Sequence, residues 1–412
     1  MRDMIGKGAN LTTLRDTNAR SVLDALVQER GISRAEVARR LGMSKPTANR
    51  AIETLTAVGL VREAPRPEGE LHYGAVFFEP AHDLGHVLGI DIGTHFIRSA
   101  LADLDGTVLA RYDRPRTAGG PSALLADVAQ VRAQVVERTP PAVEGVLATV
   151  VAVAGIVEPG SARLRVSSER ELEGYQIIEA LHQVLPGLLQ VENDANLAAL
   201  GELRRGAGRA TEDFAFLAVG SGVGAGLVLD GRLRRGHHGA AGEVDYPGHR
   251  PFAVDSAAAD ALHELIATGH QAEQRAGRTP DHAQPPTPEQ LFEQARQGNA
   301  FALKVVREEA RRVAAAIATI TLVVDLPLVV VGGGVGLNGA VLLGPLRSRL
   351  EQLVPFPPRV EISELGDAAV LIGAVSVAAR TAWPPLVTAR LNTAATTTAR
   401  ETLAAAPVAR QA

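Results

Sequence analysis

The stretch FAFLAVGSGVGAGLVLDGRLRRG, residues 214–236, decides the fold. An apolar run predicts a buried strand, a Gly-rich turn follows it, and a second apolar run leads into an Asp-Gly hairpin. The same order occurs earlier in HVLGIDIGTHFIRSALADLDGTVLARY, residues 86–112, where we predict strands over 86–92, 95–103 and 107–112. Two copies of one strand, glycine turn, strand and hairpin pattern predict two lobes of related construction with a cleft between them.

The rest of this region alternates apolar strands with helices rich in Ala and Leu, which predicts an α/β architecture. Buried strands are expected in VEGVLATVVAVAGIVEP and in LLQVEND. Residues 270–288 predict a polar loop, and the tail from about 385, rich in Thr and Ala, predicts disorder. The predicted helices cover residues 121–138, 195–204, 289–323 and 339–352.

Three Gly-rich turns follow predicted strands: DIGTH at 91–95, GSGVGAG at 220–226 and GGGVG at 332–336. Such turns free backbone N–H groups for a phosphate and let a ligand approach the chain closely. One turn is weak evidence, whereas three in corresponding places favour a nucleotide cleft or descent from one. The candidate nucleotide-loop residues are Asp91, Gly93, Gly220, Gly222, Gly224, Gly333 and Gly334.

The segment VENDANLAAL, residues 191–200, places Asn193, Asp194 and Asn196 where a strand ends and a helix begins. A carboxylate at such a place can accept a proton from a bound hydroxyl. It can also hold a ligand without reacting, or satisfy the free N–H groups of the helix that follows. Catalytic base, ligand contact and helix cap therefore all remain open for Asp194.

The first eighty residues predict a different module. A helix is expected over Thr17–Arg30, and Ser33-Arg34-Ala35-Glu36 reads as a capping box for a second helix ending at Leu41. After the turn Gly42-Met43-Ser44, Ser44 caps a third helix with Pro46 in its first turn. LVRE and GELHYGAVFFEP then read as two strands of a wing. Helix, short turn, helix and wing predict a winged helix-turn-helix.

The third helix predicts contact with DNA. Residues 30–50 hold six basic residues against Glu36 alone, although a solvated helix surface or a scaffold module would show the same charge. In the wing, Arg62, Arg66 and His72 surround acidic residues, which argues against reading of the minor groove. The side chains expected to contact bases and phosphates are Arg34, Ser44, Lys45, Thr47, Asn49 and Arg50, with Ala48 on the same face.

In this order the motifs resemble the ROK family of repressors, open reading frames and sugar kinases, on the actin-like ATPase fold. NARSVLDALVQERGISRAEVARRLGMSKPTANRAIETLTAVGLVRE resembles the winged helix-turn-helix of its repressor branch. GIDIG, VENDANLAALGE, GSGVGAGLVLDGRL, GAAGE and VVGGGVG follow, so the resemblance covers roughly residues 17–383. The implied fold class is α/β, with a winged helix-turn-helix over 1–82 and a two-lobed ROK domain over 83–384. The implied lobes are 83–194 plus 366–384, and 195–365, with a disordered tail over 385–412.

The resemblance implies that Asp194 occupies the general-base position of the kinases, and that Asn193 and Glu243 hold sugar hydroxyls. The first phosphate loop departs from the family pattern. Where the kinases have D-x-G-G-T-K, this chain runs from Asp91 to Phe96 as DIGTHF, without the second Gly, the Thr and the Lys. The second loop, Gly220–Gly226, is intact.

The family's zinc loop also departs from its pattern. The resemblance implies one His and three Cys as zinc ligands and a Glu that touches sugar, but the chain contains no Cys. Tyr246 stands at the His, Val254 at the Glu, and Asp255 is adjacent. No zinc or other cofactor is expected, and His237, His238 and His249 lack ligand spacing. The loop must be held otherwise, for example by packing of Tyr246, Pro247, Pro251 and Phe252.

We therefore predict a ROK transcriptional regulator, a repressor, that senses a sugar or sugar-derived ligand at Asn193, Asp194 and Glu243 and has no enzyme activity. The alternative is an ATP-dependent sugar kinase with an added DNA-binding module. The expected partners are operator DNA, the small-molecule effector and further copies in a homodimer or tetramer. The N-terminus lacks a signal peptide's apolar core, and no uninterrupted apolar run approaches about 18 residues, so we expect a cytoplasmic protein without a membrane.

Overall fold

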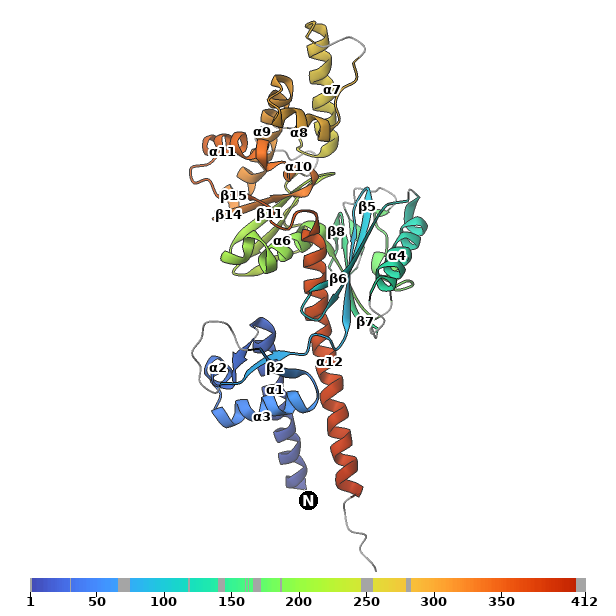
Figure 1. The fold of residues 1–412 in the computed structure, drawn as a ribbon, viewed down its shortest axis with the longest axis vertical. Helices are drawn as coiled ribbons and strands as arrows, with labels where there is room; N and C mark the ends of the chain where they lie inside the picture. Colours follow the sequence, from blue (N-terminus) through green and yellow to red (C-terminus); the bar gives the residue numbers. More distant parts are fainter. Residues whose placement is uncertain are drawn as a thin grey trace, which may run out of the picture.

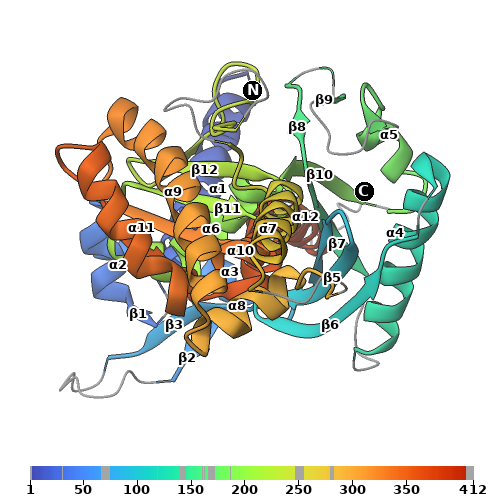
Figure 2. The same cartoon turned by 90° about the horizontal axis from the view of Figure 1, so that it is seen from above.

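The computed structural model describes residues 2–29, 31–65, 75–117, 119–139, 145–159, 161, 163–165, 172–185, 187–245, 255–278 and 283–404. The molecule is elongated, with the N-terminal module at one end and the two lobes beyond it (Figure 1). Seen along the long axis, α4 lies on the opposite side of the molecule from α9 and α11 (Figure 2). The two lobes therefore sit side by side above the N-terminal module.

The N-terminal module is a winged helix-turn-helix, as predicted. Its small sheet has the order β1–β3–β2. The first helix begins earlier than the predicted Thr17, at Arg2, and among residues 14–28 its first buried side chain is Ala19. The elements are α1 (Arg2–Gln28), β1 (Ile32–Ser33), α2 (Arg34–Arg40), α3 (Lys45–Ala57), β2 (Val61–Ala64) and β3 (Phe77–Pro80).

The first lobe is built on a five-stranded sheet with the order β10–β7–β4–β5–β6. The antiparallel strands β4 to β6 are those predicted from residues 86–112. The strand β7 pairs in parallel with β4, and β10 pairs in parallel with β7. The helix α4 packs on β5 and β6. The bounds are β4 (His86–Ile92), β5 (Phe96–Asp103), β6 (Val108–Pro115), α4 (Gly120–Glu137), β7 (Val146–Val153), β8 (Ile156–Val157), β9 (Leu164–Arg165), α5 (Ile177–Leu181) and β10 (Leu188–Asn193).

The second lobe repeats this topology with the order β13–β12–β11–β14–β15. Three antiparallel strands are again followed by two parallel additions, so the predicted likeness of the two lobes is confirmed. The bounds are β11 (Phe214–Val219), β12 (Val223–Leu229), β13 (Arg232–Arg234), α7 (Ala259–Arg275), α8 (Pro288–Arg296), α9 (Ala300–Val324), β14 (Leu328–Gly332), α10 (Gly333–Gly336), α11 (Gly339–Leu353) and β15 (Arg359–Ile362).

Two boundaries in the second lobe differ from prediction. The helix expected over 289–323 is divided into α8 and α9, because Gly298 has a positive φ of 84° and Asn299 caps a new helix. The side-chain oxygen of Asn299 accepts a hydrogen bond from the Ala302 N–H at 3.0 Å. The predicted loop over 270–288 begins later than expected, since α7 continues to Arg275.

The helix α12 (Ala369–Ala404) joins the lobes to the N-terminal module, and α6 (Asp194–Arg205) crosses it (Figure 1). The predicted disorder over 385–412 was wrong for 385–404, which continue α12, and 405–412 lie outside the described residues. Burial explains part of the difference, because Val387 and Leu391 belong to the same hydrophobic core as the helices of the N-terminal module. A hydrogen bond from Arg20 to the Thr388 hydroxyl at 2.8 Å adds a polar contact.

The segment Gly366–Thr393, which joins the turn before α12 to most of that helix, has the length and the apolar composition of a membrane span. In its most apolar window 56% of the residues are buried inside the molecule. Trp383 shows how this burial is used, since its indole N–H donates to the Leu104 carbonyl at 3.2 Å and its ring meets His82 edge-on. A core helix passes the same test as a membrane span.

The crossing of α6 and α12 gives the first testable prediction. A methyl group built on Gly373 would overlap the Leu197 carbonyl oxygen, which is backbone and cannot rotate away. Gly373→Ala is therefore expected to destabilise the protein by about 3 kcal/mol, measured by urea unfolding. Gly344→Ala is the control, because in α11 its Cβ would meet no described atom within 4 Å apart from its chain neighbours, and with Pro345 next to it the net change should stay within about 1 kcal/mol. Equal unfolding midpoints for the two variants would contradict the close crossing.

Candidate functional site

The helix α3, which the sequence predicts to contact DNA, begins at the expected cap. The Ser44 side chain accepts from the Thr47 N–H at 3.3 Å, and the two hydroxyls are 2.8 Å apart. Ala48 was wrongly placed on the outer face, because it is fully buried in the core of the module. Of the other predicted contact residues, Arg34, Ser44, Lys45 and Arg50 are exposed and Thr47 and Asn49 are partly exposed.

Part of the positive charge of residues 30–50 is neutralised by Glu36 within the N-terminal module. Arg39 and Arg40 both donate to the Glu36 carboxylate, at 2.5–2.8 Å, and their hydrogen bonds lower the Glu36 pKa to about 2. The predicted capping box is therefore half formed: the Ser33 hydroxyl accepts from the Glu36 N–H at 3.3 Å, but the carboxylate faces the arginines. Lys45 and Arg50 remain as the exposed basic residues of α3.

In the described part of the wing, the one basic residue, Arg62, is paired with acidic residues. Arg62 pairs with Glu79 at 2.8 Å and with Asp83 at 3.2 Å. The Arg34 guanidinium lies over the Phe78 ring at 5.0 Å, so it braces α2 against β3. Arg66 and His72 lie outside the described residues.

At the junction of the lobes, Asn193 rather than Asp194 caps α6. Its side-chain oxygen accepts from the Asn196 N–H at 3.0 Å, and its amide donates to the Gly155 carbonyl at 3.2 Å. Asp194 is the first residue of the helix, and one of its oxygens accepts from the Ala195 N–H at 2.8 Å. Asn193 therefore serves as the cap, one oxygen of Asp194 is held by the backbone, and its second oxygen can face a ligand.

Asp194 shares its surroundings with two other predicted site residues. Burial raises the Asp194 pKa, and together with the nearby charges of Asp91 and Glu243 it brings this pKa to about 7. Burial also raises the pKa of Glu243. The structure thus brings together three carboxyl groups from β4, α6 and the loop after β13. Such a cluster suits a ligand that donates several hydrogen bonds.

The first glycine turn is closed by an ion pair that the sequence did not reveal. Asp91 is 5% exposed and stands directly opposite Arg98 in the β4–β5 pair. The guanidinium donates to the Asp91 carboxylate at 3.1 Å, while burial raises the pKa of that carboxyl. Gly93 donates its N–H to the Phe96 carbonyl at 3.0 Å, so that this turn uses its own backbone donor.

The second and third glycine turns lie beside one another and against α6. A Cβ on Gly220 would lie 3.7 Å from the Gly334 nitrogen, and Gly333, with φ of 81°, packs on the Val219 carbonyl. A Cβ on Gly224 would contact Ala195 at 4.0 Å, next to Asp194. Gly222 has no atom within 4 Å of such a Cβ among the residues that the structure describes. The predicted loop residues therefore converge near the start of α6.

An ion pair between the lobes was missed by the sequence reasoning. Glu192, 6% exposed at the end of β10, receives a hydrogen bond from Arg235 after β13 at 2.6 Å. Its other oxygen accepts from the Asn196 amide at 2.9 Å. The Glu of VENDAN and the basic run RLRRG were both visible in the sequence, but nothing there joined them.

The zinc-loop region offers no thiolate ligand for a zinc ion. The chain has no Cys, and the described part of the molecule holds no group of three His, Cys, Asp or Glu that could bind a metal. His237 and His238 meet edge-on at 4.5 Å. Tyr246, Pro247, His249, Pro251, Phe252 and Val254 lie outside the described residues.

The chain is similar to both regulators and kinases. It is 24% identical to the "Xylose repressor" of Caldicellulosiruptor bescii, over 89% of this chain and 96% of that protein. A crystal structure of a ROK family transcriptional regulator, a homolog of the E. coli MLC protein, has a TM-score of 0.72 at 18% identity, covering 92% of this chain and 99% of that one. This second likeness shows the fold alone. A ROK family glucokinase from Streptomyces griseus, in complex with glucose and AMPPNP, has a TM-score of 0.63 at 25% identity over 72% of this chain and all of that one.

Two family models match the two parts of the chain. Residues 15–62 match "Winged helix-turn-helix DNA-binding", which agrees with the module of α1 to α3. Residues 87–381 match the ROK family model and contain both lobes and the three glycine turns. Because this match spans most of the molecule, the chain belongs to the ROK family.

Proposed function

We propose that this ROK protein is a transcriptional repressor that binds operator DNA through α3 and a sugar or sugar-derived effector at the lobe junction. The observation that carries the proposal is the exposed face of α3, where Lys45, Asn49 and Arg50 stand clear of the core. Side chains of these types read base edges and phosphates in the major groove. The likeness to a xylose repressor over both parts of the chain supports the same function.

The effector site is proposed at Asn193, Asp194 and Glu243. Their carboxylate and amide groups are suited to the hydroxyls of a sugar. An effector changes DNA binding only if its affinity differs between two conformations of the protein. The helix α12 gives a physical route, since it packs on α6 at the junction, and Val387 and Leu391 further along it pack into the core of the N-terminal module.

We further propose that the chain does not transfer phosphate. The Asp91 carboxylate accepts a hydrogen bond from Arg98, and Phe96 stands at the position where the kinases have Lys. A kinase must surround the transferred phosphate with backbone donors, a cation and a positioned base. The alternative, a sugar kinase with an added DNA-binding module, is favoured by the intact loop at Gly220–Gly226 and by the likeness to a glucokinase.

The remaining parts of the proposal concern assembly and location. A winged helix-turn-helix regulator commonly reads two half-sites as a dimer, so we propose a homodimer or tetramer on a palindromic, A/T-rich operator. We propose the cytoplasm as its location and no bound zinc or other cofactor. The effector class, the oligomeric state and the location are proposed from the regulatory function, and the fold does not depend on them.

The experiment that tests the function joins operator mapping with two assays. Genome-wide mapping supplies the operator, and fluorescence anisotropy then measures its binding with and without xylose, glucose and a wider sugar panel. We expect specific binding that at least one sugar weakens, and no ADP release from ATP with any sugar of the panel. Sugar-dependent ADP release that Asp194→Asn abolishes would support the kinase alternative instead.

A further inference from the structure

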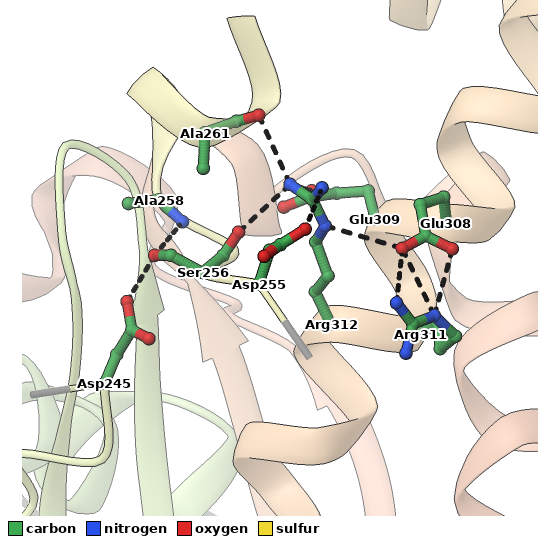
Figure 3. Close-up of polar contacts among 9 residues, drawn as sticks. All are labelled: Asp245, Asp255, Ser256, Ala258, Ala261, Glu308, Glu309, Arg311 and Arg312. Carbon is green, nitrogen blue, oxygen red and sulfur yellow. Dashed lines mark hydrogen bonds and ion pairs between the residues drawn. The ribbon is translucent and has the colours of Figure 1, made fainter. Parts of the chain in front are cut away.

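A buried arginine lies beside the loop that holds zinc in other members of the family. Arg312 of α9 is 6% exposed. Its guanidinium donates to the Ser256 carbonyl at 3.1 Å, to the Ala261 carbonyl at 3.2 Å and to the Asp255 carboxylate at 3.4 Å (Figure 3). One side chain thus fixes the segment that leads from the loop into α7.

Ser256 extends this contact to the other end of the loop. Its hydroxyl hydrogen-bonds the Asp245 carboxylate and accepts from the Ala258 N–H at 3.0 Å (Figure 3). Asp245 precedes the loop and Asp255 follows it. The two described ends are therefore clamped together, and α9 holds the clamp through Arg312.

The charge of Arg312 is matched within this cluster. A buried guanidinium needs opposite charge and hydrogen-bond acceptors, because removal from water is costly. Asp255 supplies a carboxylate at 3.4 Å and Glu308 another at 3.6 Å. The fully buried Glu309 adds a third carboxyl group at 3.9 Å, and burial raises its pKa to about 8 although Arg312 lowers it.

We infer that Arg312 is the positioning residue that replaces zinc, holding the ends of the loop so that Glu243 faces the effector. Glu243 is two residues before Asp245, a span of at most about 7 Å. A displacement of Asp245 would therefore move Glu243 relative to Asp194 across the proposed site. The inference rests on the proposed function for the role of Glu243, while the clamp itself rests on the contacts of Arg312.

The test compares Arg312→Met with Arg311→Met. Arg311 is the adjacent residue and is partly exposed, and its guanidinium donates to the Glu308 carboxylate at 2.6 Å. We expect Arg312→Met to raise the sugar concentration that releases half of the operator at least tenfold. Operator affinity without sugar should stay within twofold, and Arg311→Met should resemble the wild type in both. A wild-type sugar response in Arg312→Met would overturn the inference, as would an EDTA-induced loss of response in the wild type.

Two further measurements keep the test decisive. If Arg312→Met does not fold, Ser256→Ala removes the hydroxyl's bonds to Asp245 and to the Ala258 N–H but keeps the backbone carbonyl that Arg312 contacts. It should shift the sugar response about threefold in the same direction. If no sugar acts on the wild type, the proposed effector function fails while the clamp can still be tested. Hydrogen exchange should then be faster at residues 242–245 and 255–258 in the Arg312 or Ser256 variant than in Arg311→Met, and equal exchange would refute the clamp.

Discussion

Replacing Asn49 and Arg50 together by alanine is expected to abolish specific operator binding by this protein. Both side chains lie on the outer side of α3, whose N-terminus is capped by Ser44 and is the part that we propose enters a major groove. Each base or phosphate contact is worth about 1–3 kcal/mol. Loss of both therefore predicts at least a roughly thirtyfold fall in affinity, measured by anisotropy at fixed salt.

The control for this prediction removes the same kind of charge elsewhere. Arg275 of α7 and Arg307 of α9 are exposed in the second lobe, far along the chain from α3. Their double alanine variant should bind operator as the wild type does, within about twofold. Loss of Arg50 should also flatten the dependence of log affinity on log salt by about one. Unchanged operator binding in the Asn49 and Arg50 variant would refute α3 as the recognition helix.

The parts of the fold that sequence predicted correctly are those governed by local chemistry. Ser44 caps α3 because its hydroxyl reaches a free N–H of the first turn. Asp230 and Gly231 form their hairpin because both accept positive φ, 54° and 67°. The extent of α12 could not be read in this way, because its burial against the N-terminal core depends on contacts distant in sequence.

The candidate site shows the same division. The order of the motifs predicted Asp91, Asp194 and Glu243, and the structure places their charges near one another. Two ion pairs near the site were hidden in the sequence: that of Arg98 with Asp91 and that of Arg235 with Glu192. Arg98 is 7 residues from Asp91, whereas Arg235 is 43 residues from Glu192. Charge alone does not specify which of many arginines meets a given carboxylate, since tertiary packing decides it.

Asp194→Asn is expected to abolish the response to effector while leaving operator binding intact. The carboxylate that would accept an effector hydroxyl becomes an amide, and a charge-assisted hydrogen bond is worth about 1.5–3 kcal/mol. Effector affinity should therefore fall roughly tenfold to more than a hundredfold. The variant should stay folded, because a neutral amide avoids burying a charge. We would measure operator release across a sugar titration and compare urea unfolding of both proteins.

The pH dependence separates this role from simple helix capping. With an Asp194 pKa of about 7, raised by burial and by Asp91 and Glu243, the wild type holds the ionised acceptor at pH 8 and largely loses it at pH 6. Effector affinity should thus fall about tenfold between pH 8 and pH 6, whereas the Asp194→Asn variant should not change through this group. Stability changes in the opposite direction. A carboxyl whose pKa is raised on folding costs stability as pH rises from its unfolded value through 7, so Asp194→Asn should be at least as stable as the wild type at pH 8. If Asp194→Asn responds to effector as strongly as the wild type, and neither protein's effector affinity changes between pH 6 and pH 8, the role of Asp194 would be limited to its hydrogen bond with the Ala195 N–H.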